Sequence, residues 1–366
     1  MIQKTIVITG THQSPATELI RQLKMDNTIH WKVYYIGRKY RSTSTKITTT
    51  EYDLFREMVD AYITIESAKF HRHSIYQSLL TFPYLFSSIY TSYVSLKQIK
   101  PNILVSLGGY ISIPVLIAGK LLGIKSIIHE QTLTNSLTTK ISSYFVNKVA
   151  LSFDNLEQIK SLPKDKVVIT GNLIRNEILQ KSKINILKEY FKNKKPVLYI
   201  TGGNQGSVVI NKILLSILPK LLVNYNIIHQ VGNYDYDQVL SSTKSLTNSY
   251  VCKDYFPPQQ VAAILQQSEI IIGRSGANIC HELVALQKKC ILIPLSFSQQ
   301  NEQLKNANWT QKKLGRIVEI IPENNLTGKS LQTKIENIID IPSISNFQTE
   351  HLGSQNFMKL IHETTN

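Results

Sequence analysis

The 366-residue sequence has few cysteines and no long apolar segment. Its three cysteines have no CxxC spacing and no matching histidine cluster, which argues against a disulfide framework or a structural zinc site and favours a reducing compartment. Nowhere do about 18 uncharged apolar residues run together, as a spanning helix requires. The best candidate, residues 111–122, is interrupted by Pro114 and Lys120. The N-terminus also lacks the apolar core of a secretory signal. We therefore expect a soluble or peripheral protein.

Acidic residues are also scarce. Asp and Glu number 25 against 41 Lys and Arg, which gives a net charge of +16. This excess favours acidic partners such as nucleic acid, anionic lipid or a phosphorylated substrate. Only 18% of the residues are charged and no basic helix stands out, which argues against a protein that reads a nucleic-acid groove. With 42% apolar residues the chain can bury one or two sizeable cores, which excludes disorder.

Short β-branched runs that lead into a glycine turn and an amphipathic helix recur along the chain. The runs that lead into glycine are Thr5–Thr9, Ile103–Ser106, Val197–Thr201 and Glu269–Ile272. Further apolar runs predict strands at Ser126–Ile128, Val167–Ile169, Ile227–Gln230 and Cys290–Pro294. This alternation predicts an α/β fold with doubly wound parallel sheets.

The glycine-rich turns fall into two sets, which predicts two Rossmann-like domains facing one another across a cleft. We expect the first domain at residues 1–170 and the second at 171–345. Residues 346–366 show helical spacing of apolar side chains and are expected to form a C-terminal helix that packs back on the first domain.

Two turns in the second half have the features of anion sites. Residues 200–207, ITGGNQGS, lie between a predicted strand and a helical pattern, where glycine amides and a helix N-terminus can meet a phosphate. Residues 273–278, GRSGAN, have the same setting, and Glu282 in the helix behind them suits ribose hydroxyls. Each turn alone is compatible with a plain tight turn. Together they indicate a nucleotide.

In the first half, polar or glycine-rich segments follow two further predicted strands. They are residues 107–112, LGGYIS, and the triplet His129-Glu130-Gln131. Both are expected at the carboxyl edge of the sheet, where open α/β sheets bind ligands. Buried polar side chains at that edge would need partners. The residues themselves leave open a ligand site and an internal hydrogen-bond network.

Several segments resemble the MurG family in order and spacing. They are Thr9–Ala16, Ser106–Gln131, Ile169–Ile178, Ile200–Ser207 and Gly273–Pro294. That family is the UDP-N-acetylglucosamine:lipid I N-acetylglucosaminyltransferase of bacterial cell-wall synthesis. The resemblance implies a two-domain GT-B fold and an inverting transfer, by direct displacement, of N-acetylglucosamine to the 4-hydroxyl of the muramic acid sugar on lipid I. We expect no metal and no other cofactor, because no acidic pair precedes the diphosphate turn and helix dipoles and amides can meet the charge on departing UDP.

The resemblance implies that the UDP-sugar binds mainly in the second domain. Phe256 and its neighbouring backbone correspond to the uracil site, residues 274–279 to the diphosphate turn, and Gln303 to the glutamine that reads the sugar hydroxyls. The implied donor-binding residues are Arg175, Asn204, Gln205, Phe256, Ser275, Gly276, Ala277, Glu282 and Gln303. Asn204 replaces the family's usual serine, and Leu173 replaces a proline close to Arg175.

On the acceptor side the implied binding residues are Thr11, Gly108, Gly109, Tyr110, His129, Gln131 and Thr132. His12 is the first candidate for catalytic base or orienting group, because an unperturbed pKa of about 6.5 suits proton abstraction, and Glu130 is the other.

The acceptor side departs from the family in two places. Residues 9–16 keep the His, Pro and Ala of the family's GGTGGHxxPA loop but lose most of its glycines, and Thr132 replaces an asparagine. We expect Thr11 to be strained at positive φ and to obstruct a diphosphate. Three alternatives therefore stay open: a paralogous GT-B glycosyltransferase with another lipid or polysaccharide acceptor, a UDP-sugar-binding protein without turnover, and, less favoured by the charge pattern, a nucleic-acid binder.

Residues 79–93 are apolar and rich in aromatics, with basic residues on either side. The flanking cations are Lys69, Arg72, Lys97 and Lys100. This pattern suits an anionic membrane surface, although a buried helix would have a similar sequence. The resemblance implies peripheral docking at the cytoplasmic face of the bacterial plasma membrane. The expected partners are UDP-GlcNAc, undecaprenyl-pyrophosphoryl-MurNAc-pentapeptide and the membrane, and no nucleic acid.

Overall fold

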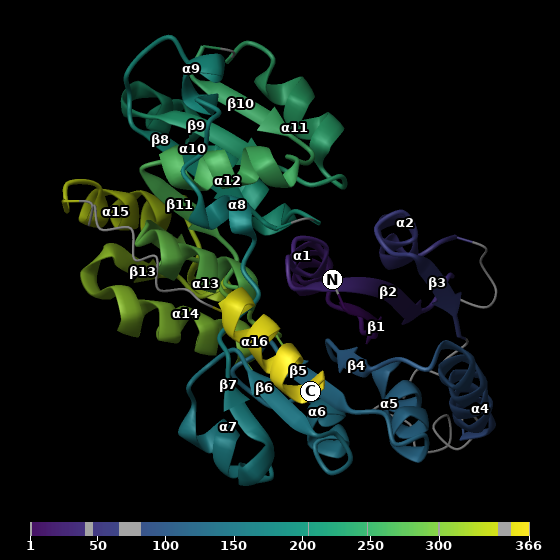
Figure 1. Ribbon diagram of the computed structural model, residues 1–366. Coiled ribbons are helices and arrows are strands. Elements are labelled where there is room, and N and C mark those ends of the chain that lie inside the picture. The colour runs from purple at the N-terminus through teal and green to yellow at the C-terminus, as the bar shows by residue number, and fades with distance from the viewer. Residues whose placement is uncertain are drawn as a thin grey trace. The chain divides into compact units, whose positions relative to one another are not determined.

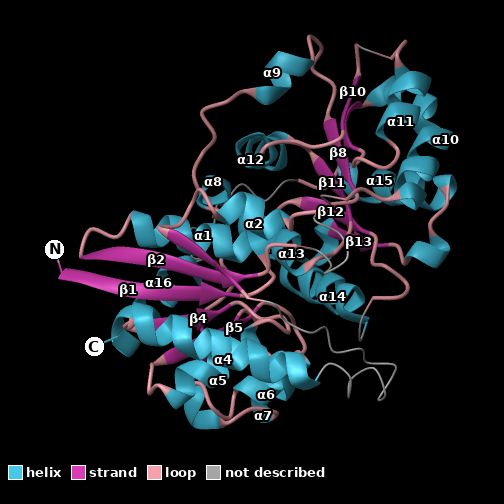
Figure 2. Ribbon diagram, turned by 90° about the vertical axis from the view of Figure 1, so that its right-hand side faces the viewer, coloured by secondary structure: helices cyan, strands magenta, loops and turns pink. Residues whose placement is uncertain are grey.

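The computed structural model describes residues 2–40, 47–65, 82–203, 205–246, 248–298, 301–342 and 353–365. The chain forms two compact units (Figure 1). Unit 1 comprises Met1–Ile174 together with His351–Asn366, and unit 2 comprises Arg175–Glu350. Each unit has one parallel sheet with helices on both faces (Figure 2).

Within the described residues, the sheet of unit 1 has seven strands in the order β3-β2-β1-β4-β5-β6-β7. The strands are β1 Ile2–Thr9, β2 Ile29–Gly37, β3 Ala61–Thr64, β4 Ile103–Ser106, β5 Ser126–Glu130, β6 Lys148–Leu151 and β7 Val167–Ile169. The helices are α1 Gln13–Lys24, α2 Thr50–Phe55, α4 Phe82–Ile99, α5 Ser112–Leu121, α6 Leu137–Ser142, α7 Leu156–Lys160 and α16 Gly353–Thr365.

The described sheet of unit 2 has six strands in the order β10-β9-β8-β11-β12-β13. The strands are β8 Val197–Thr201, β9 Asn226–Gln230, β10 Tyr250–Lys253, β11 Ile270–Gly273, β12 Lys289–Leu292 and β13 Val318–Ile320. The helices are α8 Asn176–Leu179, α9 Ile186–Tyr190, α10 Val208–Asn224, α11 Tyr236–Thr243, α12 Pro258–Gln267, α13 Ala277–Leu286, α14 Glu302–Leu314 and α15 Gly328–Ile339.

Both sheets have a point at which the strand order reverses. In unit 1 it lies between β1 and β4, and in unit 2 between β8 and β11. The connections that follow two such neighbouring strands lead to opposite faces of the sheet, which opens a crevice where α/β proteins bind ligands. The glycine-rich turns of this chain follow these four strands. The fold thus explains why these turns are the candidate site.

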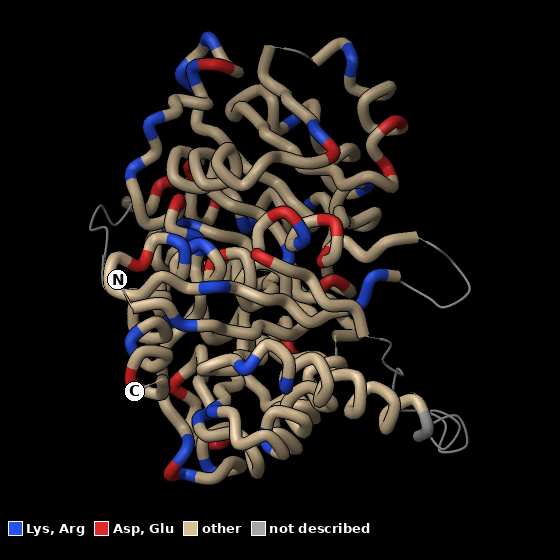
Figure 3. Tube along the Cα trace, turned by 45° about the vertical axis from the view of Figure 1, so that its right-hand side comes forward, with Lys and Arg blue, Asp and Glu red and all other residues tan. Residues whose placement is uncertain are grey.

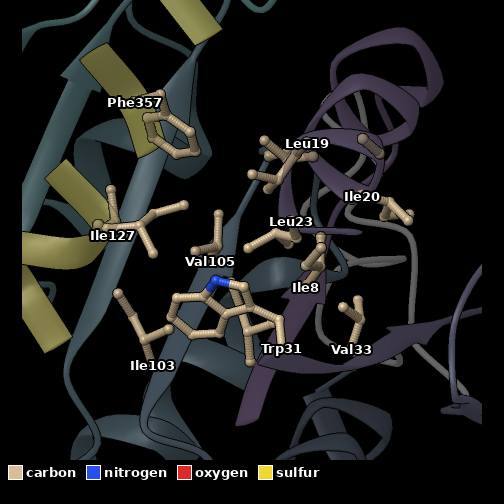
Figure 4. Close-up of a cluster of buried hydrophobic side chains, with 14 of the residues drawn as sticks. Ile8, Leu19, Ile20, Leu23, Trp31, Val33, Ile103, Val105, Ile127 and Phe357 are labelled. Atoms are coloured by element: carbon tan, nitrogen blue, oxygen red, sulfur yellow. The ribbon is translucent and has the colours of Figure 1, made fainter. Parts of the chain in front are cut away.

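The core of unit 1 joins the two ends of the chain. Leu19 and Leu23 of α1 lie beside Ile8 and Val105 of the sheet, and Phe357 of α16 lies over Ile127 (Figure 4). A Cβ on Gly353, the first residue of α16, would collide with the carbonyl oxygen of Asn172. The helix therefore starts in close contact with the segment that leads into unit 2. No helix in the described ranges is long and apolar enough to cross a membrane.

Asp26 ties α16 to this core through a buried carboxylate. Its Oδ2 accepts hydrogen bonds from Trp31 Nε1 at 2.8 Å and His362 Nε2 at 2.7 Å. Its Oδ1 accepts from the backbone and hydroxyl of Thr28 and from the backbone of Ile29. Burial alone would raise the pKa of Asp26, but these hydrogen bonds outweigh burial and hold the pKa well below its usual value.

We expect Asp26→Asn to lower the free energy of unfolding by roughly 1.5–3 kcal/mol, because an amide nitrogen cannot accept the bonds of one carboxylate oxygen. Since the folded pKa is depressed, the wild-type contribution is present above the unfolded pKa of about 3.9 and is lost as the pH falls below it. Urea unfolding between pH 3 and 7 measures both effects. The exposed Asp165→Asn is the matched control. Equal stability of Asp26→Asn and Asp165→Asn would contradict the assignment.

Candidate functional site

The loop after β1 avoids the strain expected at Thr11. Positive φ falls on Gly10, at 147°, and not on Thr11, so the expectation of a strained threonine is wrong. The backbone N–H of Thr11 donates to the carbonyl of Gly108 at 3.2 Å. A Cβ on Gly109 would collide with the Thr11 side chain. The threonine thus covers Gly109, and a diphosphate approaching there would meet a hydroxyl and a methyl group instead of a bare glycine.

His12 lies between this loop and α1, with its side chain exposed. It occupies the N-cap position without capping the helix through its side chain. A Cβ on Gly108 would lie 3.7 Å from His12 Nε2, so the imidazole faces the loop that follows β4. Desolvation by the surrounding protein lowers the pKa of His12, and the carboxylates of Glu130 and Glu51 oppose that shift. Glu51, on α2, was not expected from the sequence, because α2 follows a run of polar residues with no motif.

Glu130 is not arranged as a catalytic base. Its side chain is buried, and Oε1 accepts from the backbone N–H of Thr132 at 3.2 Å, with the Thr132 hydroxyl at 2.9 Å. Oε2 accepts from the backbone of Ser136 at 2.9 Å and from the hydroxyl of Thr139 at 2.6 Å. A carboxylate that accepts from two backbone N–H groups and the Thr139 hydroxyl, with the Thr132 hydroxyl beside it, has little capacity left for a substrate proton. We therefore correct its role, and that of Thr132, to holding the loop that precedes α6.

His129 also has a structural position. The ring is fully buried, 4.9 Å from the ring of Phe357, and its Nε2 lies 3.2 Å from the carbonyl oxygen of Gly171. Nδ1 lies 3.1 Å from Nε2 of Gln131. Burial lowers the pKa of His129 to about 4. In this arrangement the His129 side chain cannot touch the acceptor substrate, so the predicted direct contact is corrected. His129 instead links Gln131 to the segment that leads to unit 2.

Tyr110, which precedes α5, stacks against the guanidinium of Arg38, a residue that was not predicted from the sequence. The Arg38 guanidinium lies 5.0 Å from the centre of its ring. The Tyr110 hydroxyl is buried and has no hydrogen-bond partner within the described part of the chain. Arg38 directly follows β2, a strand not marked by a glycine-rich motif. It places a positive charge beside the Gly108–Gly109 turn.

In unit 2, the turn after β8 is braced by a neighbouring strand. Nε2 of Gln230, at the end of β9, donates to the carbonyl of Gly203 at 3.1 Å. A Cβ on Gly206 would collide with the backbone of Val231, whereas a Cβ on Gly203 would meet nothing within 4 Å. Gly206 thus serves backbone packing, and Gly203 faces open space. Gln205 is exposed, and Asn204 lies outside the described residues.

The turn after β11 ends at the N-terminus of α13. Gly276 is the N-cap residue, Ala277 begins the helix, and a Cβ on Gly276 would have no neighbour within 4 Å. The Ser275 hydroxyl is fully buried and donates to the carbonyl of Gln303 at 2.7 Å. Gln303 Oε1 accepts from the backbone of Leu295 at 3.1 Å. The open surface of this turn is therefore its backbone at Gly276 and Ala277.

The guanidinium of Arg274 is engaged by three groups of the protein. It donates to the Ser207 hydroxyl at 2.7 Å and to the Ile293 carbonyl at 3.3 Å, and it pairs with Glu323. Ser207 caps α10. Arg274, expected at the start of the diphosphate-binding turn, thus connects the two glycine-rich turns through its side chain.

Arg175 and Glu282 form a two-pronged ion pair. Arg175 Nε and one terminal nitrogen each lie 2.8 Å from a different Glu282 oxygen. The side chains are 23% and 5% exposed, so water screens the pair only partly. Glu282 raises the pKa of Arg175 against the opposing effect of burial. The structure brings together two residues that were predicted separately to bind the donor.

Phe256 is fully buried, in edge contact with Tyr199. Its ring therefore cannot stack on a base, and any contact it makes with uracil must come from its backbone. Within the described ranges no group of three or more His, Cys, Asp or Glu side chains is arranged to hold a metal ion.

These two parallel-sheet units have the GT-B fold, and the chain matches glycosyltransferase family 28: its N-terminal domain over residues 6–151 and its C-terminal domain over residues 197–364. The crystal structure of Acinetobacter baumannii MurG is similar in fold, with a TM-score of 0.71 and 18% identity over 98% of this chain and 99% of that chain.

Curated relatives are similar over nearly the full length. The UDP-N-acetylglucosamine--N-acetylmuramyl-(pentapeptide) pyrophosphoryl-undecaprenol N-acetylglucosamine transferase of Clostridium botulinum (strain Loch Maree / Type A3) is 31% identical over 99% of both chains. The enzyme of the same name from Clostridium kluyveri is 33% identical over 92% of this chain and 91% of its own. The chain belongs to this family of N-acetylglucosaminyltransferases.

Proposed function

We propose that this protein transfers N-acetylglucosamine from UDP-GlcNAc to the 4-hydroxyl of the N-acetylmuramic acid sugar of lipid I, giving lipid II for peptidoglycan synthesis. The observation that carries the proposal is the 31% identity to such a transferase over 99% of both chains. The four turns at the two strand-order reversals add support, because they are built from the residues that carry the resemblance.

In the proposed mechanism the acceptor oxygen attacks the anomeric carbon while the bond from that carbon to the UDP oxygen breaks. The proton of the hydroxyl passes to His12 Nε2. The backbone at Gly276 and Ala277, at the positive end of α13, meets the charge that develops on the departing diphosphate. Arg175 and Glu282 bind the diphosphate and ribose.

Purified protein with UDP-GlcNAc labelled in the sugar and with lipid I tests the proposal. We expect labelled lipid II and UDP in equal amounts, with or without EDTA. Binding of UDP-GlcNAc without transfer to any acceptor would make the protein a sugar-nucleotide binder. Transfer to a different lipid-linked sugar but not to lipid I would contradict the assignment of lipid I as the acceptor substrate.

We also propose that unit 1 docks on the cytoplasmic face of the plasma membrane through α4. Phe86 and Tyr90 are 60% and 70% exposed, and with Tyr93 and Lys97 they follow the spacing of one helical face. Lys97 is the sole charged residue of this helix, which Figure 3 shows as the tan helix after the grey trace at the lower right. Leu79 and Leu80 lie outside the described residues, as do Lys69 and Arg72. An aromatic face with a basic end suits an anionic lipid surface.

Tyr90→Asp should reduce co-sedimentation with vesicles of phosphatidylglycerol and phosphatidylcholine by several-fold, because it places a negative charge within the aromatic face. Tyr234→Asp, at an 86% exposed tyrosine of unit 2, is the matched control and should bind as the wild type does. Added salt should weaken wild-type binding through screening. Unchanged binding of Tyr90→Asp would show that α4 does not contact the bilayer.

A further inference from the structure

Gln131 has a buried carbonyl oxygen without a partner. The side chain is 3% exposed, and Oε1 accepts no hydrogen bond within the described part of the chain. A buried acceptor left unpaired costs free energy. This alone does not mark a site, because Oε1 of Gln158 on α7 is also unpaired. What distinguishes Gln131 is how firmly its amide is oriented and what it faces.

The orientation of the amide follows from His129. The Gly171 carbonyl can only accept, so His129 Nε2, at 3.2 Å, must carry the proton of the neutral ring. His129 Nδ1 is then an acceptor and takes its hydrogen bond from Gln131 Nε2 at 3.1 Å. The lowered pKa of His129 keeps the ring neutral at physiological pH. Oε1 of Gln131 therefore points away from His129.

The position that a side chain on Gly108 would occupy lies near both Gln131 and His12. A Cβ on Gly108 would lie 3.9 Å from Gln131 Oε1 and 3.7 Å from His12 Nε2. Gly108 has no side chain, and its φ of 81° disfavours one. Two hydrogen-bond acceptors beside one small space fit a ligand with two neighbouring O–H donors. In the acceptor sugar, O3 is an ether, so the hydroxyl nearest to the 4-hydroxyl is on C6.

We propose that Gln131 Oε1 accepts a hydrogen bond from the 6-hydroxyl of the acceptor sugar while His12 Nε2 accepts one from the reacting 4-hydroxyl. His129 is a positioning residue that acts through Gln131. The proposal rests on the proposed function and adds to it the residue that recognises the second hydroxyl. It also explains why a fully buried histidine lies beside the acceptor loop.

The test compares lipid I with its 6-deoxy analogue. With wild-type protein, kcat/KM should fall about 10- to 100-fold when the 6-hydroxyl is missing, because Oε1 is then left buried and unpaired. Gln131→Met keeps the volume but removes the carbonyl, so it should use lipid I poorly and lose most of the discrimination between the two acceptors. Affinity for UDP, measured by calorimetry, should stay unchanged.

Gln158→Met controls for the loss of a buried glutamine amide and should keep full discrimination. His129→Asn should also lower the discrimination ratio, which partial unfolding cannot do because it reduces both rates equally. Equal use of both acceptors by the wild type, or full discrimination by Gln131→Met, would overturn the proposal. If wild-type protein transfers nothing to lipid I, the proposed function fails as well, whereas loss of this proposal alone leaves turnover of lipid I intact.

Discussion

His12→Ala should reduce kcat for transfer to lipid I about a hundredfold or more, with UDP affinity unchanged. General base catalysis typically contributes factors of this order, and the His12 imidazole faces the Gly108 turn from an exposed position. With the Glu130 carboxylate already engaged by Thr132, Ser136 and Thr139, His12 is the candidate base that the structure leaves available.

Single-turnover kinetics with saturating UDP-GlcNAc measure this effect without a contribution from product release. His30→Ala, at an exposed histidine of β2 in the same unit, is the matched control and should keep its rate. If His12→Ala reacts as fast as His30→Ala, the base must be another group, and solvent water becomes the next candidate.

Glu282→Ala should weaken UDP binding by roughly 1.5–3 kcal/mol, the cost of losing hydrogen bonds to a charged group. The ion pair between Arg175 and Glu282 means that Glu282→Ala also affects the protein itself. In the structure the carboxylate expected to hold the ribose is bound to Arg175, so donor binding must exchange these contacts for contacts with the ligand. Removing Glu282 also leaves a guanidinium without its partner, which should lower the melting temperature of unit 2.

A double-mutant cycle separates the two roles. Arg175→Ala should weaken UDP binding too, and the double variant should lose less than the sum of the single losses, because the two side chains interact directly. Calorimetry with UDP gives each affinity, and Glu336→Gln on α15 serves as an exposed control. Strictly additive losses would show that the two side chains act independently on UDP binding, whereas an unchanged affinity of Glu282→Ala would remove Glu282 from the donor site.

Apart from Val167–Ile169, the strands that the sequence predicted are mostly buried apolar runs. Ile103–Ser106 and Val197–Thr201 agree with β4 and β8 residue for residue, because strands buried on both faces are continuously apolar. β2 was missed because His30 and Lys32 interrupt its apolar pattern. β6 was missed although most of it is buried, since no glycine turn follows it. The edge strands β3, β10 and β13 were missed as well; they are short and only partly buried, as is the edge strand β7, which was predicted.

In the candidate site, too, some features could be predicted from the sequence and others could not. Motif order and spacing indicated which turns carry the chemistry, because backbone amides at strand ends depend on local glycine content and on the helix that follows. The tasks of the individual side chains did not follow from that pattern. Glu130, His129 and Arg274 share motifs with predicted ligand contacts, yet each is engaged by groups that are remote or unremarkable in sequence.

Local sequence patterns were enough for the α/β class and the individual turns, and the order of those turns along the chain was enough for the family resemblance. The direction of a buried polar side chain depends on which donors and acceptors the fold brings to it. His129 meets Gly171, 42 residues away, and Arg175 meets Glu282, 107 residues away. Such pairings minimise unpaired buried polar atoms over the whole unit, so only the tertiary structure could distinguish side chains held by the protein from those left for a ligand.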